Sequence, residues 1–126
     1  MNTFEIARER WNHCLEQFSR AHAGQEAQVC TSGAAGGGAS NAELPLIGVT
    51  SDAGDLHIML GRPGGPHMDH VVPHPQRLWT AEWNDGVSGM LEIDADDGST
   101  TLVRVGPHEE LLGEGMILDG VPPGRA

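Results

Sequence analysis

Ligand-type side chains gather in the middle of the chain, where they could bind a transition metal. Seven such residues fall within an 18-residue segment: His57, Met59, His67, Met68, Asp69, His70 and His74. Imidazole, thioether and carboxylate groups together suit copper, zinc or nickel, and methionine favours copper(I). A metal site formed by His57, His67, Asp69 and His70 is therefore one hypothesis for this segment.

That hypothesis depends on how two predicted strands, residues 56–60 and 67–72, pair as a hairpin. If Leu60 pairs with His67, two histidines and two methionines meet across the strands. If Leu60 pairs with Met68, apolar residues match far better and the cluster is lost, because a shift of one residue reverses every side chain. We expect the second register, so surface histidines are the preferred interpretation and metal binding is the alternative.

Recognisable catalytic motifs are missing from the sequence. No G-x-S-x-G segment frames a serine, and the glycine-rich stretch has neither a GK[ST] ending nor a G-x-G-x-x-G turn. Cys14 adjoins His13, but neighbouring helix residues point about 100° apart and do not face one another. We therefore expect no catalysis, and a small enzyme whose site forms only in the fold is the second alternative.

An N-terminal helix is the clearest element that could position these groups. Apolar residues recur at spacings of three and four between residues 3 and 23, which predicts one amphipathic helix. The apolar stripe contains Phe4, Ala7, Trp11, Cys14, Leu15, Phe18 and His22. Asn2 is a suitable N-cap and Gly24 a suitable stop, while Glu16 and Arg20 have the spacing of a helical ion pair.

The rest of the chain alternates apolar and polar residues, which predicts strands joined by short turns. We expect strands over residues 46–50, 56–60, 67–72, 78–83, 87–94 and 99–105, with a weaker one over 26–31. Such short connections require antiparallel neighbours. The expected fold class is α+β, with the helix packed on an antiparallel sheet of about five to seven strands or on a small, partly closed barrel.

The length of 126 residues suits one domain. We expect that α+β domain to occupy residues 1–105 and to contain a flexible Gly/Ala-rich loop at 32–42. Residues 106–126 are expected to form an acidic, Gly/Pro-rich C-terminal tail.

The charge balance excludes two classes of partner. The net charge is −11 and no basic stripe is present, so nucleic acid and anionic membrane surfaces are repelled. Neither a signal peptide nor an apolar run of the ~20 residues that a spanning helix needs is found. Cys14 and Cys30 form no disulfide framework, and Cys14 is expected to be a reduced, buried thiol. Together these features predict a cytoplasmic protein.

Several short motifs along the chain resemble an uncharacterised bacterial domain family of unknown function. They are Trp11…Leu15…Phe18-Ser19-Arg20…His22…Gly24, LPLIGVTSD (44–52), LHIMLG (56–61), HMDHVVPHPQRL (67–78) and LEIDADDGSTTLVRV (91–105). Members of that family have a helix reading W…FSRxHxG and a final hairpin resembling LEIExxDGxxTLLRF. The resemblance covers residues 8–105 and implies a small stand-alone bacterial domain. It brings no activity, so no functional residue is transferred.

Elimination leaves a non-catalytic protein-interaction or accessory domain of a bacterial cytoplasmic protein. Trp79, Ala81 and Trp83 are expected on one strand face, beneath the helix with Leu91 and Ile93. If the helix leaves Trp79 or Trp83 uncovered, that side chain could anchor a partner.

The second candidate interaction segment is the apolar patch of Met116, Ile117 and Leu118 in the tail, which could equally pack on its own sheet. We expect a protein partner or a homo-oligomer and no cofactor, with copper, zinc or nickel as the alternative.

Overall fold

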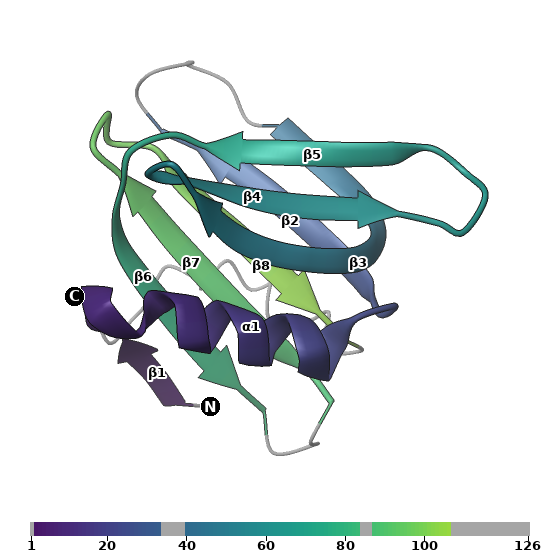
Figure 1. Ribbon diagram of the computed structural model, residues 1–126, viewed down its shortest axis with the longest axis horizontal. Helices are drawn as coiled ribbons and strands as arrows, with labels where there is room; N and C mark the ends of the chain where they lie inside the picture. Colours follow the sequence, from purple (N-terminus) through teal and green to yellow (C-terminus); the bar gives the residue numbers. More distant parts are fainter. Residues whose placement is uncertain (1, 34–39, 84–86, 107–126) are drawn as a thin grey trace.

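The computed structural model describes residues 2–33, 40–83 and 87–106. In this part of the chain, eight antiparallel strands form one sheet in the order β1-β6-β7-β8-β2-β3-β4-β5 (Figure 1). The strands are β1 (Asn2–Glu5), β2 (Glu26–Ser32), β3 (Ser40–Asp52), β4 (Asp55–Gly61), β5 (His67–Val72), β6 (Pro75–Glu82), β7 (Gly89–Ala95) and β8 (Thr100–Val105). A short 3-10 helix (Arg8–Arg10) leads into the helix α1 (Trp11–His22). The predicted α+β class is confirmed, although the described strands do not close into a barrel.

The strand count is higher than expected because the first residues do not join the helix. Residues 2–5 form β1, which pairs with β6 so that Phe4 lies opposite Thr80. Phe4 is consequently 59% exposed instead of lying on a helical stripe, and Asn2 is not an N-cap. The indole N–H of Trp11 donates to the carbonyl oxygen of Ile6 at 2.9 Å, holding the incoming chain against the start of α1.

The end of α1 matches the sequence-based expectation. Gly24 has φ = +85°, the left-handed conformation in which glycine commonly ends a helix. The guanidinium of Arg20 donates to the carboxylate of Glu16 at 2.6 Å, as their spacing predicts. None of the described segments is a helix with the length and apolar character needed to cross a membrane.

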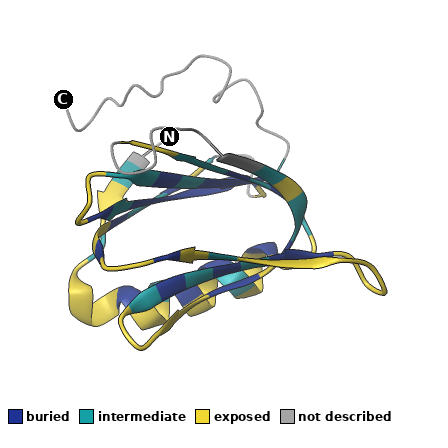
Figure 2. Cartoon of the chain, turned by 90° about the horizontal axis from the view of Figure 1, so that it is seen from above, coloured by how far each residue is buried: buried dark blue, intermediate teal, exposed yellow. Residues whose placement is uncertain are grey.

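Strand β3 belongs to both layers of the fold. Its first half, residues 40–45, pairs with β2, and its second half, residues 46–52, pairs with β4. The register shifts between Leu46 and Gly48, and a β-bulge of this kind bends and twists a strand. The sheet therefore folds over into a back layer of β1, β6, β7, β8 and β2 and a front layer of the second half of β3, β4 and β5 (Figure 2).

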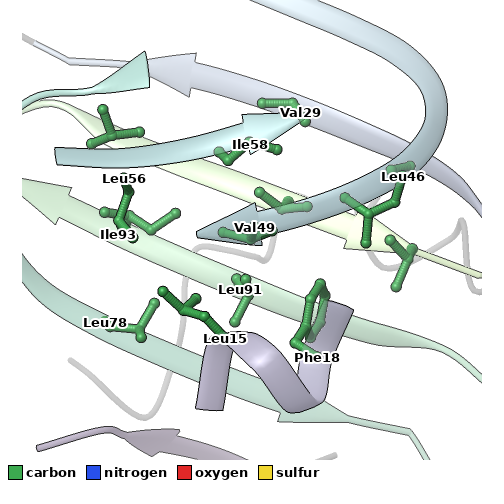
Figure 3. Close-up of a cluster of buried hydrophobic side chains, with 14 of the residues drawn as sticks. Leu15, Phe18, Val29, Leu46, Val49, Leu56, Ile58, Leu78, Leu91 and Ile93 are labelled. Carbon is green, nitrogen blue, oxygen red and sulfur yellow. The ribbon is translucent and has the colours of Figure 1, made fainter. Parts of the chain in front are cut away.

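The core lies between the two layers. Its largest fully buried side chains include Leu46, Val49, Leu56, Ile58 and Leu60 from the front and Val29, Leu78, Leu91, Ile93, Val103 and Val105 from the back. Helix α1 lies beside β3, and its Leu15 and Phe18 complete this cluster (Figure 3). The helix thus packs against β3 and contributes to the core between the layers.

The β6–β7 register corrects one expectation. Trp79 pairs with Glu92, whereas Leu78 pairs with Ile93. Leu91 and Ile93 therefore share the core face with Leu78, and Trp79 points to the other side of the sheet. The reason is a one-residue difference in register across the turn, which reverses the face of each side chain.

Candidate functional site

The β4–β5 hairpin has the register that was expected to separate the histidines. Leu60 pairs with Met68, and His70 lies opposite the buried Ile58. His57 therefore points outward from the front layer, while His70 points toward the core.

Two of the four predicted metal ligands meet on the outer face of this hairpin. The Nδ1 atom of His57 lies 3.0 Å from Oδ2 of Asp69, and this hydrogen bond raises the pKa of His57. His67 lies farther along, with its ring against Gly61. Across residues 2–33, 40–83 and 87–106, no group of three or more His, Cys, Asp and Glu side chains could hold a metal ion. The fold therefore brings together fewer ligands than the three or four of a typical zinc site.

His70 instead joins a polar bridge between the two layers. Its Nε2 lies 3.0 Å from the hydroxyl oxygen of Thr31 on β2. That hydroxyl is in turn 3.0 Å from the hydroxyl of Thr101 on β8. Burial lowers the pKa of His70, because desolvation disfavours the charged ring. The bridge favours a neutral imidazole and fixes β5 over the back layer.

The tryptophans named as partner anchors are both partly buried. The indole N–H of Trp79 donates to Oδ2 of Asp94 at 3.3 Å. Met116, Ile117 and Leu118 lie outside the described residues. The interaction role of these five side chains stays a prediction.

An open groove runs between α1 and β6, and we call it the α1–β6 groove. Its volume is about 640 Å³, within the range of small-molecule sites. The lining residues are Cys14, Gln17, Phe18, Arg20, Ala21, Thr80 and Glu82. Cys14 is only partly buried, not fully as expected; desolvation raises the pKa of its thiol and the charge of Glu82 raises it further. Neither Cys14 nor Cys30 forms a disulfide within the described residues.

A buried histidine lies behind the wall of this groove. His22 is 2% exposed, and its Nδ1 is 2.8 Å from Oε1 of Gln25. Its Nε2 faces Glu82, 3.5 Å from Oε2, and has no hydrogen-bond partner among the described residues. A Cβ atom added to Gly89 would lie 2.7 Å from that Nε2, so only glycine leaves room for the ring. The position of the His22 ring is therefore set by contacts between α1, Glu82 on β6 and Gly89 on β7.

Strand β5 forms one free edge of the sheet. Within the described residues it pairs with β4 alone, at the end of the strand order. Met68 and Val71 are each 42% exposed on it. The β4–β5 hairpin also projects beyond the rest of the fold (Figure 1).

The sequence analysis identified neither the groove nor the free edge as a site. The groove joins residues from α1 and β6 that are far apart in the chain, and no local motif marks them. The sequence does contain a pattern that could have indicated an edge strand: Pro66 and Pro73 flank a six-residue strand that contains no proline. Proline lacks the N–H that a ladder needs, so this spacing limits pairing to residues 67–72.

Comparison with known proteins gives a family but no activity. A model described as a family of unknown function (DUF5335) matches residues 2–112. Neither the curated proteins nor the solved structures contain a match to this chain.

Proposed function

The chain belongs to this family of unknown function, and we propose that it is a non-catalytic interaction domain that binds an extended segment of another protein along β5. The observation that carries the proposal is the free edge of β5, which is exposed at four of its six positions. Backbone N–H and C=O groups at such an edge can pair with one more strand.

β5 suits strand addition better than β1, the opposite edge. β1 has four residues, whereas β5 has six and so offers more backbone groups to a partner. Native edges are commonly protected by lysine, proline or bulges, and the 67–72 segment contains none of these. The exposed side chains of Met68 and Val71 add apolar area on the two faces of the strand.

Charge favours a basic partner. The chain carries a net charge of −11, which would oppose the approach of a second copy and attract an extended segment rich in Lys and Arg. The proposed role requires no cofactor and no catalytic group. A bacterial cytoplasmic location forms part of the proposal and is compatible with two described cysteines that form no disulfide, since that compartment keeps cysteines reduced.

A displayed library of ten-residue peptides tests this proposal. We expect the selected peptides to alternate basic with β-branched residues and, as synthetic peptides, to protect the backbone amides of residues 67–72 from hydrogen exchange. The Val71→Lys variant should weaken their binding about tenfold, or about 1.4 kcal/mol, by repelling a basic segment and removing apolar contact.

Val87→Lys is the matched control, because Val87 is also 42% exposed and lies just before β7. Equal weakening by both variants, or amide protection confined to another part of the chain, would overturn the assignment to β5. A dimer detected by light scattering and lost in Val71→Lys would replace the basic segment with a second copy as the occupant.

A further inference from the structure

The α1–β6 groove combines an apolar wall with a carboxylate that has few neighbours. Ala21 and Cys14 supply the apolar surface from the helix, because the third apolar lining residue, Phe18, is only 3% exposed. Thr80 and Glu82 supply oxygen atoms from β6. The side chain of Glu82 is 57% exposed, so a ligand can reach its carboxylate from solvent.

The hydrogen bonding of His22 directs its second ring nitrogen toward the carboxylate of Glu82. Since the amide oxygen of Gln25 can only accept, the Nδ1 of His22 carries the proton that joins them. The other ring nitrogen, Nε2, has no hydrogen-bond partner among the described residues and lies 3.5 Å from Oε2 of Glu82. One imidazole nitrogen therefore approaches the Glu82 carboxylate from the buried side, while the carboxylate stays open to solvent on its other side.

No arginine of the described residues forms an ion pair with Glu82. Arg20 lines the same groove, but its guanidinium is bound to Glu16 at 2.6 Å. Within the described part of the chain, His22 is the one basic group within 4 Å of the Glu82 carboxylate. A positive charge placed on the solvent side of Glu82 would stabilise this arrangement.

We propose that the α1–β6 groove binds a small organic cation, an ammonium or guanidinium group on a short apolar body, with its charge on Glu82. The apolar body lies against Ala21 and the side chain of Cys14. The hydroxyl of Thr80 donates to the carbonyl oxygen of Met90, which leaves its oxygen free to accept from the ligand's N–H groups. His22 is buried and does not touch the ligand. It contacts the Glu82 carboxylate from the side opposite to solvent.

This site is independent of the β5 edge, and simple probes test it. Benzylamine and butylguanidine are titrated into the isotope-labelled full chain at neutral pH, with benzyl alcohol as the uncharged analogue. We expect both cations to shift the amide signals of residues 14–21 and 80–82 in a saturable manner, and benzyl alcohol to bind at least tenfold more weakly.

The Glu82→Gln variant should weaken both cations at least tenfold, because it removes the charge while keeping the shape. Glu9→Gln is the matched control, since it makes the same change on an exposed carboxylate of the preceding 3-10 helix, outside the groove lining, and should leave binding within twofold. Thr80→Val supplies a second variant and should weaken binding severalfold. Equal binding of benzyl alcohol, unchanged binding in Glu82→Gln, or shifts confined to other elements would overturn the proposal.

Discussion

The side chain of Ser19 on α1 occupies the place of a neighbouring strand beside Val49 on β3. Its hydroxyl oxygen accepts a hydrogen bond from the Val49 N–H at 2.8 Å. Its proton is directed to the carbonyl oxygens of Leu15 at 2.8 Å and Val49 at 3.2 Å. Covering a strand edge with a helix removes a template for unwanted pairing, and here one hydroxyl hydrogen-bonds both backbone groups of the buried Val49.

Replacing Ser19 with alanine should leave the N–H of Val49 without its acceptor. We expect the free energy of unfolding to fall by about 1–3 kcal/mol, the usual cost of an unsatisfied buried group. Urea denaturation measures this change, and the Val49 amide should exchange its hydrogen faster. Ser51→Ala is the control, because Ser51 is exposed on the same strand. Equal stability of the two variants would contradict the role of the Ser19 hydroxyl.

Gly89→Ala should disturb the packing of His22. The added Cβ would lie 2.7 Å from Nε2 of His22 and 3.2 Å from both carboxylate oxygens of Glu82. Overpacking of this kind costs about 1–3 kcal/mol, measured by thermal or urea unfolding.

Gly65→Ala is the control for that change, since its Cβ would make no contact shorter than 3.5 Å. In a His22→Ala background the cost of Gly89→Ala should largely disappear, because the ring that the new methyl group meets is gone. A cost that persists in the double variant would assign the effect to the backbone instead.

Acid should weaken the bridge between the two layers through His70. Burial lowers the pKa of this ring below its ordinary value of about 6.5. The unfolded chain therefore binds the proton more readily, so the contribution of His70 is fully present above about pH 6.5 and is lost as the pH falls through the folded-state pKa. His70→Gln should reduce the pH dependence of the unfolding free energy between pH 8 and 5. An unchanged profile would exclude the bridge as its source.

His57 should behave in the opposite sense. The hydrogen bond from its ring to Asp69 raises its pKa, so its stabilising contribution is present below about pH 6.5 and is lost as the pH rises through the raised value. Asp69→Asn should bring the pKa of His57 back toward its ordinary value, as measured by titrating the imidazole proton signals. The charge of Asp55 also raises this pKa, but more weakly than Asp69 does, so Asp55→Asn should lower the pKa of His57 less.

Local patterns predicted much of this fold. Val71 and its neighbours occupy the expected strand 67–72, and the apolar matching of Leu60 with Met68 correctly identified the register of that hairpin. The end of α1 just before Gly24 could also be predicted from the sequence, because a left-handed backbone position favours glycine.

Tertiary contacts decided the parts that the sequence did not predict. Phe4 fits a helical stripe, yet pairing with β6 outweighs that local preference. The side of the sheet on which Trp79 lies depends on a single residue of register near the turn after β6. The contact between His22 and Glu82 depends on how α1 crosses the back layer, which no spacing in the chain encodes.

The strand order has a kinetic consequence. Thr31 and Thr101 touch across 70 residues of sequence, and Arg8 reaches the carbonyl of Pro75 across 67. Neither the β2–β8 ladder nor the β1–β6 ladder can form until most of the chain has been brought together. Closing loops of that size costs conformational entropy before the stabilising contacts between the strands can form. Folding should therefore take milliseconds to seconds, and the hairpins β4–β5, β6–β7 and β7–β8 should form before the strands that join the two ends of the chain.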